Sequence, residues 1–189
     1  KWQILKELRE EASLMMHPLT KAHIHCIVYG SLARGDVKQT SDIDVFIPNI
    51  NSSTIVEAIL SRNGRQFISR QIIQATPSYA AKAYLFISED RGYSFPLVDL
   101  RVNEREFYKF AGSNTYQQLK TGLRVSGVDK RLMLIEPTEK GHLETPIKGN
   151  EGRVARKLGI NLFTVRDRAR ALKRREKVGR TGVYLKREL

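Results

Sequence analysis

Asp42 and Asp44 are separated by one residue in the segment SDIDVFI, where polar and apolar residues alternate. In a β-strand, residues two apart point to the same face, so both carboxylates project from one side while Ile43 and Val45 face the core. Two carboxylates on one face form a site for a hard divalent cation, and Mg²⁺ is usually held by such groups together with substrate phosphates. A surface acidic pair on an ordinary strand is the alternative interpretation.

A Gly-Ser turn precedes this strand. Gly30 and Ser31 follow the apolar run HIHCIVY and lead into LARGDV, which we expect to form a short helix. The free N–H groups and the positive dipole end at a helix N-terminus favour phosphate binding. The sequence therefore predicts that a metal ion and a phosphorylated substrate meet at one place.

The pattern GSLARG followed by SDID resembles the nucleotidyltransferase superfamily that includes DNA polymerase beta. By that resemblance, Gly30, Ser31 and Arg34 bind the triphosphate of an NTP or dNTP substrate. Asp42 and Asp44 would bind two Mg²⁺ or Mn²⁺ ions. The reaction so implied is in-line attack of a hydroxyl on the α-phosphorus, with release of pyrophosphate.

The resemblance also implies a third carboxylate on a neighbouring strand, which helps to bind the catalytic metal and activates the attacking hydroxyl. Asp99 is the best candidate for this third catalytic and metal-binding residue, because it is a lone acid in the strand-like run FPLVDLRV. A salt bridge between Asp99 and Arg101 is the alternative. Glu89 and Asp90, in a polar turn before Gly92, are weaker candidates.

A second Gly-Ser pair follows Asp99 in the segment FYKFAGSNTY. This segment is similar to the aromatic and Gly-Ser turn that family X polymerases place against the incoming nucleotide, so Gly112 and Ser113 are predicted to bind the nucleotide. Lys109 stands where those polymerases usually carry a tyrosine, which leaves sugar selection open. A plain helix start, with Ser113 or Asn114 as N-cap, explains the same residues.

Positive charge is concentrated at the C-terminal end of the chain. The net charge is +13, and residues 153–189 contain 13 basic and three acidic residues, so they carry +10 of it. A balance this basic favours a polyanionic partner such as nucleic acid. We therefore expect DNA or structured RNA to bind at this end, and we expect no membrane partner.

The basic segment has the pattern of a helix-turn-helix. Ala155, Gly159 and Val165 have the expected spacing, although Arg168 stands where a further apolar residue is usual. VGRTGVYLKREL is predicted to form a winged hairpin, and a solvated basic helix is the alternative to the whole motif. The residues expected to contact nucleic acid are Arg166, Arg170, Lys173 and Arg174.

Alternating strand and helix patterns predict an α/β (α+β) fold, with a mixed sheet flanked by helices and a small C-terminal helical domain. A helix over 2–16 should end at Pro18, strands are expected over 42–48, 66–75 and 94–102, and SYAAKAYLFI is ambiguous between helix and strand. The predicted catalytic domain covers 1–135 and the basic domain covers 153–189. A connector over 136–152, rich in Gly, Pro and Thr, should join them.

The composition indicates which classes of protein the chain can belong to. The chain is 41% hydrophobic and 28% charged, and no apolar run approaches the roughly 20 residues of a membrane span, so we expect a cytoplasmic protein. A single cysteine, Cys26, excludes an internal disulfide framework.

Three functions remain open from the sequence. The first is a metal-dependent nucleotidyltransferase that acts on nucleic acid. The second is nucleotidyl transfer to a protein or a small molecule, as in minimal nucleotidyltransferases, which the GSxARG and SDID pattern also resembles. The third is a DNA-binding regulator whose nucleotidyltransferase domain senses nucleotide without turnover, which the set of Asp42, Asp44 and Asp99 argues against.

Overall fold

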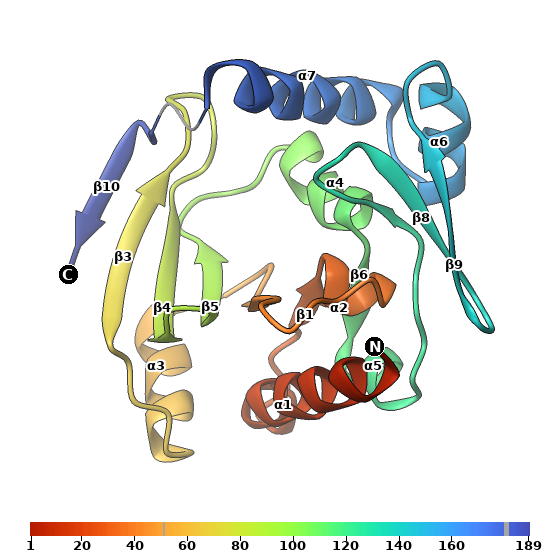
Figure 1. Ribbon diagram of the computed structural model, residues 1–189. Helices are drawn as coiled ribbons and strands as arrows, with labels where there is room; N and C mark the ends of the chain where they lie inside the picture. The colour runs from red at the N-terminus through yellow and green to blue at the C-terminus, as the bar shows by residue number, and fades with distance from the viewer. Residues whose placement is uncertain (51, 180–181) are drawn as a thin grey trace.

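The strand that carries the aspartates lies inside a seven-stranded mixed sheet in the computed structural model, which describes residues 1–50, 52–179 and 182–189 (Figure 1). In spatial order the sheet contains β10 (Leu185–Glu188), β3 (Ser69–Gln74), β4 (Lys82–Ser88), β5 (Arg91–Pro96), β2 (Ile43–Phe46), β1 (Ile27–Tyr29) and β6 (Ser113–Thr115). A second sheet contains β7 (Gly127–Val128), β8 (Met133–Thr138) and β9 (Gly141–Pro146). The helices are α1 (Trp2–Lys21), α2 (Ser31–Arg34), α3 (Ser53–Arg62), α4 (Val102–Ala111), α5 (Tyr116–Lys120), α6 (Glu151–Leu158) and α7 (Leu162–Val178). The predicted mixed α/β architecture is confirmed.

One face of the large sheet packs on helices α1 and α3. The apolar residues of β2 that alternate with the aspartates, Ile43 and Val45, are fully buried there with Met15 of α1 and Leu60 of α3. Because the pleat alternates, the aspartates of the same strand are directed to the other face. The packing of α1 and α3 therefore sets which face carries the candidate site.

Helix α1 continues through Pro18 to Lys21, so the predicted helix end at Pro18 is wrong. A proline inside a helix leaves the carbonyl four residues earlier without its usual donor. Here that carbonyl belongs to Leu14, and it accepts a hydrogen bond of 2.8 Å from Nη2 of Arg65. A distant arginine thus replaces the donor that Pro18 removes.

Part of the opposite sheet face is covered by helix α4. Tyr108 of α4 stacks on Phe46 of β2, with ring centroids 3.8 Å apart and an interplanar angle of 11°. Tyr29 and Phe107 pack at the edge of the same cluster. The helix covers the end of β2 at Phe46, while Asp44 lies nearer the start of the strand.

The C-terminal helices share a core with the three-stranded sheet. Val154 of α6 and Val165 of α7 are buried in one cluster with Phe110 of α4 and Leu134 of β8. Where the sequence predicted a connector over 136–152, the structure has most of the β8–β9 hairpin and the start of α6. Residues 153–178 therefore pack on the elements before them.

Helix α7 is also fixed to the middle of α4 and to the loop before β4, where the hydroxyl of Tyr79 donates to Asp167 at 2.9 Å. Glu106 of α4 accepts hydrogen bonds from Asn161 N (3.1 Å), from Asn161 Nδ2 (2.7 Å) and from Thr164 Oγ1. The guanidinium of Arg168 lies 4.7 Å from the ring centroid of Phe107. This contact explains why a basic residue occupies the position where an apolar one was expected.

The predicted winged hairpin at the C-terminus is wrong. β10 instead pairs antiparallel with β3, with Leu185 opposite Gln74 and Glu188 opposite Gln71, so the end of the chain joins the large sheet (Figure 1). The unpaired backbone groups at the edge of β3 provide this partner. Arg180 and Thr181, at the tip of the predicted hairpin, lie outside the described residues. Within the described parts of the chain, no helix is both long and apolar enough to cross a membrane.

Candidate active site

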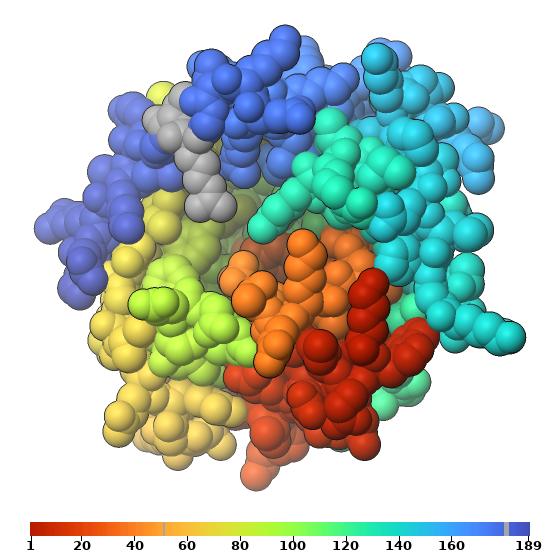
Figure 2. All heavy atoms as spheres, viewed as in Figure 1, coloured from red at the N-terminus to blue at the C-terminus, as the bar shows by residue number. Residues whose placement is uncertain are grey.

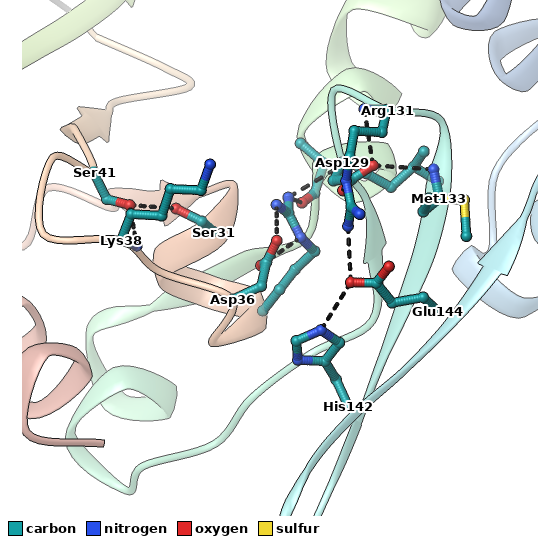
Figure 3. A network of polar contacts seen from close by, with 12 residues as sticks. Ser31, Asp36, Lys38, Ser41, Asp129, Arg131, Met133, His142 and Glu144 are labelled. Atoms are coloured by element: carbon teal, nitrogen blue, oxygen red, sulfur yellow. Dashed lines mark hydrogen bonds and ion pairs between the residues drawn. The ribbon is translucent and has the colours of Figure 1, made fainter. Parts of the chain in front are cut away.

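The Gly-Ser turn and the aspartate strand lie side by side because β1 and β2 are antiparallel neighbours. Val28 pairs with Val45, and this register sets Tyr29 opposite Asp44. The hydroxyl of Ser31 donates to the hydroxyl of Ser41 over 3.3 Å, directly before Asp42 (Figure 3). The turn and both carboxylates therefore lie at the same end of these strands, as the sequence predicted.

Gly30 has a backbone that other residues rarely adopt. Its φ is 82° and its ψ is −145°, and a Cβ added there would meet nothing within 4 Å. Its N–H donates to the carbonyl of Gly112 over 2.9 Å. The turn thus leaves open space beside its backbone, which suits close approach of a phosphate group.

The second Gly-Ser pair lies against the first. β6 pairs with β1 so that Ser113 is opposite Tyr29, and Gly112 accepts the hydrogen bond from Gly30. The structure therefore brings Gly30, Ser31, Gly112 and Ser113 together, although they are far apart in the sequence. Their contact with nucleotide stays a prediction.

Arg34 has a different role from the one that the sequence predicted. Its side chain is buried, its Nε and Nη2 atoms bond the carboxylate of Asp36 at 3.0 and 2.9 Å, and its Nη1 donates to the carbonyl of Ala111 at 2.6 Å. A guanidinium engaged in this way inside the protein is not available to a triphosphate. Arg34 instead fastens helix α2 to the start of the second Gly-Ser turn.

The two aspartates differ in environment. Asp42 is exposed, whereas Asp44 is half-buried beside it. Burial, together with the negative charge of Asp42, raises the pKa of Asp44 to about 6, and the positive charge of Lys130 acts in the opposite direction. At neutral pH Asp44 is therefore mainly ionised, in a state that a bound cation would stabilise.

Arg91 is the basic residue next to Asp42. Its Nη1 donates to the carbonyl of Ser41 at 3.2 Å, and its Nε and Nη2 bond the carboxylate of Glu11 at 2.8 and 3.0 Å. Hydrogen bonds to Glu11 raise the pKa of Arg91, and the charge of Asp42 acts in the same direction. Arg91 thus joins helix α1 to the start of the aspartate strand.

Lys130 is presented by the rigid turn between β7 and β8. Asp129 accepts hydrogen bonds from Arg131 N (2.9 Å), from Met133 N (3.0 Å) and from Arg131 Nε (2.7 Å), and Arg131 also pairs with Glu144 at 2.8 Å (Figure 3). Sequence reasoning missed Lys130 and Arg91. No local signal could have indicated Lys130, because only the chain fold brings its turn near Asp44.

Asp99 is not brought to the aspartate pair. The strand predicted over 94–102 ends at Pro96, and Asp99 lies exposed in the loop before α4. The parallel register of β2 and β5 sets Asp44 beside Gly92, well before Asp99 along the chain. Among residues 1–50, 52–179 and 182–189, no group of three acidic, histidine or cysteine side chains is arranged to hold a metal.

The weaker candidate Asp90 lies nearer to the pair. Its carbonyl accepts a hydrogen bond of 2.9 Å from Ile43 N, at the start of β2. Its carboxylate, however, accepts a hydrogen bond from Ser88 at 2.8 Å and pairs with Arg91 at 2.9 Å. Among the described residues, Asp42 and Asp44 are therefore the carboxylates at this place that have no hydrogen-bond or ion-pair partner.

A donor set of this kind fits one Mg²⁺ or Mn²⁺ ion. Such ions are commonly bound by one or two carboxylates together with substrate phosphates and water. Asp42 and Asp44 would supply the carboxylates, and a triphosphate at the Gly-Ser turns would supply the other oxygens. A second ion held by Asp99 does not follow from this arrangement.

The four basic residues predicted to bind nucleic acid are all exposed on helix α7. A groove of about 490 Å³ lies between this helix and the start of α6, lined by Arg166, Arg170 and Lys173, by Phe163 and by the acidic Glu151. Gly159, with φ 62° and ψ 43°, makes the turn between the two helices. The helix-turn-helix assignment stays a prediction.

Comparison with known proteins agrees with the local geometry. Residues 3–75 match the family model described as a nucleotidyltransferase domain, and this region contains the first Gly-Ser turn and both aspartates. No curated protein and no solved structure matches the chain. The chain therefore carries a nucleotidyltransferase domain, consistent with the polymerase beta-like superfamily that its motifs predicted.

Proposed function

We propose that the protein transfers a nucleoside monophosphate from an NTP or dNTP to a hydroxyl of a nucleic-acid acceptor, with a divalent metal ion as cofactor. The observation that carries this proposal is the juxtaposition of Asp42 and Asp44 with the open Gly30–Ser31 turn. The carboxylates would bind the metal ion and the turn would bind the phosphates of the same nucleotide.

The residues around the pair have separate roles in this proposal. The Gly-Ser turns at Gly30 and Gly112 bind the triphosphate, and Asp42 and Asp44 hold the cation against it. When bound, the cation stabilises the charge that develops on the phosphate oxygens and lowers the pKa of the attacking hydroxyl. Lys130, whose charge lowers the pKa of Asp44, contributes positive charge on the same side.

A nucleic-acid acceptor is supported by charge. Residues 153–189 carry +10, and the exposed face of α7 presents Arg166, Arg170 and Lys173 without a described acidic partner except Glu151 at the rim of the groove. Arginine and lysine side chains bind the phosphate backbone and supply most of non-specific affinity.

Incubation of the protein with Mg²⁺ and each labelled NTP or dNTP, in the presence of tRNA, primed DNA or cell extract, tests the proposal. We expect label in nucleic acid and release of pyrophosphate, both abolished by Asp42→Asn and by Asp44→Asn. Label in protein would instead support the minimal nucleotidyltransferase alternative. Nucleic-acid binding without any turnover would support the nucleotide-sensing regulator.

Asp99→Asn is the matched comparison for the two aspartate variants. Its carboxylate is exposed and lies away from the pair, so we expect nearly normal turnover. Loss of turnover as complete as that of Asp44→Asn would show that Asp99 joins the site when substrate binds.

A further inference from the structure

The large sheet sets different residues on the two sides of Asp44. On one side β1 places Tyr29 opposite Asp44, and on the other side β5 places Gly92 beside it. The next strand, β4, places Phe86 beside Gly92. A Cβ added at Gly92 would lie 3.1 Å from Cδ1 of Phe86, so the phenylalanine ring lies over the position where Gly92 lacks a side chain.

Phe86 belongs to an aromatic pair on the face that carries the aspartates. The rings of Tyr84 and Phe86 stack with centroids 6.0 Å apart and an interplanar angle of 10°. Both side chains are half-buried, whereas Ala83 and Leu85, which alternate with them, are buried in the core. The pair therefore keeps aromatic surface accessible beside the site.

The molecular surface has room for a ligand at this place. Figure 2 shows the surface hollowed between helix α7 (blue), the segment that contains α2 and β2 (orange) and strands β3 and β4 (yellow to yellow-green). Aromatic rings with an exposed face form a typical surface for single-stranded nucleic acid, because every base has a face that can stack.

In-line chemistry assigns the two sides of Asp44 to different parts of the reaction. The attacking oxygen and the leaving oxygen must lie on opposite sides of the phosphorus. Both Gly-Ser turns, at Gly30 and Gly112, lie on the β1 and β6 side. A triphosphate bound there places its leaving pyrophosphate on that side, so the acceptor approaches from the side of Gly92, Phe86 and Tyr84.

We propose that Tyr84 and Phe86 form the acceptor subsite and stack the terminal base of a single-stranded nucleic acid, an inference that rests on the proposed function. Because Gly92 has no side chain, the Phe86 ring lies close to the strand of Asp44, and a base stacked on this pair would hold its terminal hydroxyl near the α-phosphorus. The acceptor oxygen forms the new bond to phosphorus and its proton passes to water. The bond from phosphorus to the bridging oxygen breaks, and pyrophosphate leaves with that electron pair.

A single-stranded oligonucleotide with 2-aminopurine at its 3′ end tests the stacking directly, because its fluorescence is quenched on stacking and the readout needs no turnover. We expect quenching by the wild-type protein. Phe86→Leu and Tyr84→Leu should bind the oligonucleotide about 5- to 100-fold more weakly, in line with the loss of base–aromatic stacking. In the transfer assay they should raise KM for the acceptor and leave KM for the NTP unchanged.

Leucine keeps an apolar side chain at each position, and circular dichroism shows whether each variant is folded. Phe86→Tyr keeps the ring and should restore quenching. Trp2→Leu is the control, since this aromatic residue is 53% exposed on α1, away from both basic and aromatic surfaces discussed above, and we expect it to quench like the wild type. Phe163→Ala tests whether the base lies instead in the groove on α7.

Two results would overturn the inference. One is that both folded leucine variants quench and bind the oligonucleotide as the wild type does, even if they still transfer nucleotide to nucleic acid. The other is loss of quenching in Phe163→Ala alone, which would place the base on α7. Failure of the proposed function is distinguished from both, because it appears as normal quenching without transfer from any nucleotide to any acceptor.

Discussion

Arg34 and Ala111 are joined by a hydrogen bond of 2.6 Å from Nη1 to the carbonyl oxygen, and this bond fixes the two Gly-Ser turns to each other. The side chain of Arg34 also packs on Gly112, because a Cβ added to that glycine would lie 2.9 Å from Cγ of Arg34. The geometry of the region that we propose to bind phosphate therefore depends on Arg34, which also pairs with Asp36.

Replacing Arg34 with methionine should destabilise the protein by about 3–5 kcal/mol, because the carboxylate of Asp36, whose side chain is only 14% exposed, loses its partner. Urea denaturation followed by circular dichroism measures the free energy of unfolding. Lys6→Ala is the control, since the Lys6–Glu10 pair is exposed and should change stability by less than about 1 kcal/mol. A stable Arg34→Met protein with only a higher KM for NTP would restore Arg34 as a triphosphate ligand.

Gly30→Ala and Gly112→Ala should have different effects, although φ is 82° at both glycines. At Gly30 the new methyl group enters open space, so the backbone strain costs about 1–3 kcal/mol and the main effect is a higher KM for NTP. At Gly112 the methyl group also meets Arg34 and the carbonyl of Ser126 at 3.1 Å. Thermal melting should therefore show a larger loss for Gly112→Ala, and equal losses would contradict the tight packing there.

Asp44→Asn should stabilise the metal-free protein above pH 6. The pKa of Asp44 is raised from 3.8 to about 6 on folding, so the stability that comes from its protonated form is present below pH 4 and is lost as pH rises through 6. Above pH 6 the Asn variant has no carboxylate to ionise, and this ionisation lowers the free energy of unfolding of the wild type by up to about 3 kcal/mol. Unfolding free energies compared at pH 5 and pH 8 test this, and a difference independent of pH would contradict it.

Mg²⁺ should reverse the order of stability of these two proteins. A cation that binds only the folded state raises the melting temperature with its concentration. We expect this rise for the wild type at pH 8 and little rise for Asp44→Asn. An equal rise in both proteins would show that the ion binds elsewhere.

The local pattern around the site could be predicted from sequence because it depends on short-range geometry. The alternation in SDIDVFI predicted the strand and the sheet face to which the aspartates point. The Gly-Ser turn predicted where the proposed phosphate site lies relative to that strand. The strand predicted over 94–102 and the hairpin predicted at the C-terminus were wrong, because both outcomes depended on distant partners. β5 ends at Pro96, and residues 185–188 pair with β3, a strand formed by residues far earlier in the chain.

Arg34 shows a second reason for such failures. Its position in the motif is compatible with either a phosphate ligand or a buried ion pair, and only the closeness of Asp36 and Ala111 decides between them. In the same way, the Arg65 contact with Leu14 keeps α1 helical beyond Pro18. Sequence patterns predict an element more reliably than they predict the long-range contacts that extend it.

Removing basic side chains from α7 should weaken nucleic-acid binding and its dependence on salt. For Arg170→Ala and Lys173→Ala we expect the slope of log K against log salt concentration to fall by about 1 each, because each contact to phosphate releases counterions. Fluorescence anisotropy at several salt concentrations measures this slope. Arg62→Ala, an exposed residue of α3, should leave it unchanged, and an equal effect of Arg62→Ala would indicate only a general charge effect.

The strand order of the large sheet limits how the chain can be divided. The matched family region ends near β3, but β3 is separated from β2 in the sheet by β4 and β5, which both come later in the chain. A fragment that stopped at residue 75 would leave β2 with an open edge where β5 belongs and would leave β3 without its neighbour. Completion of the sheet beside the aspartates therefore requires synthesis at least through Pro96, about twenty residues beyond the end of the family match.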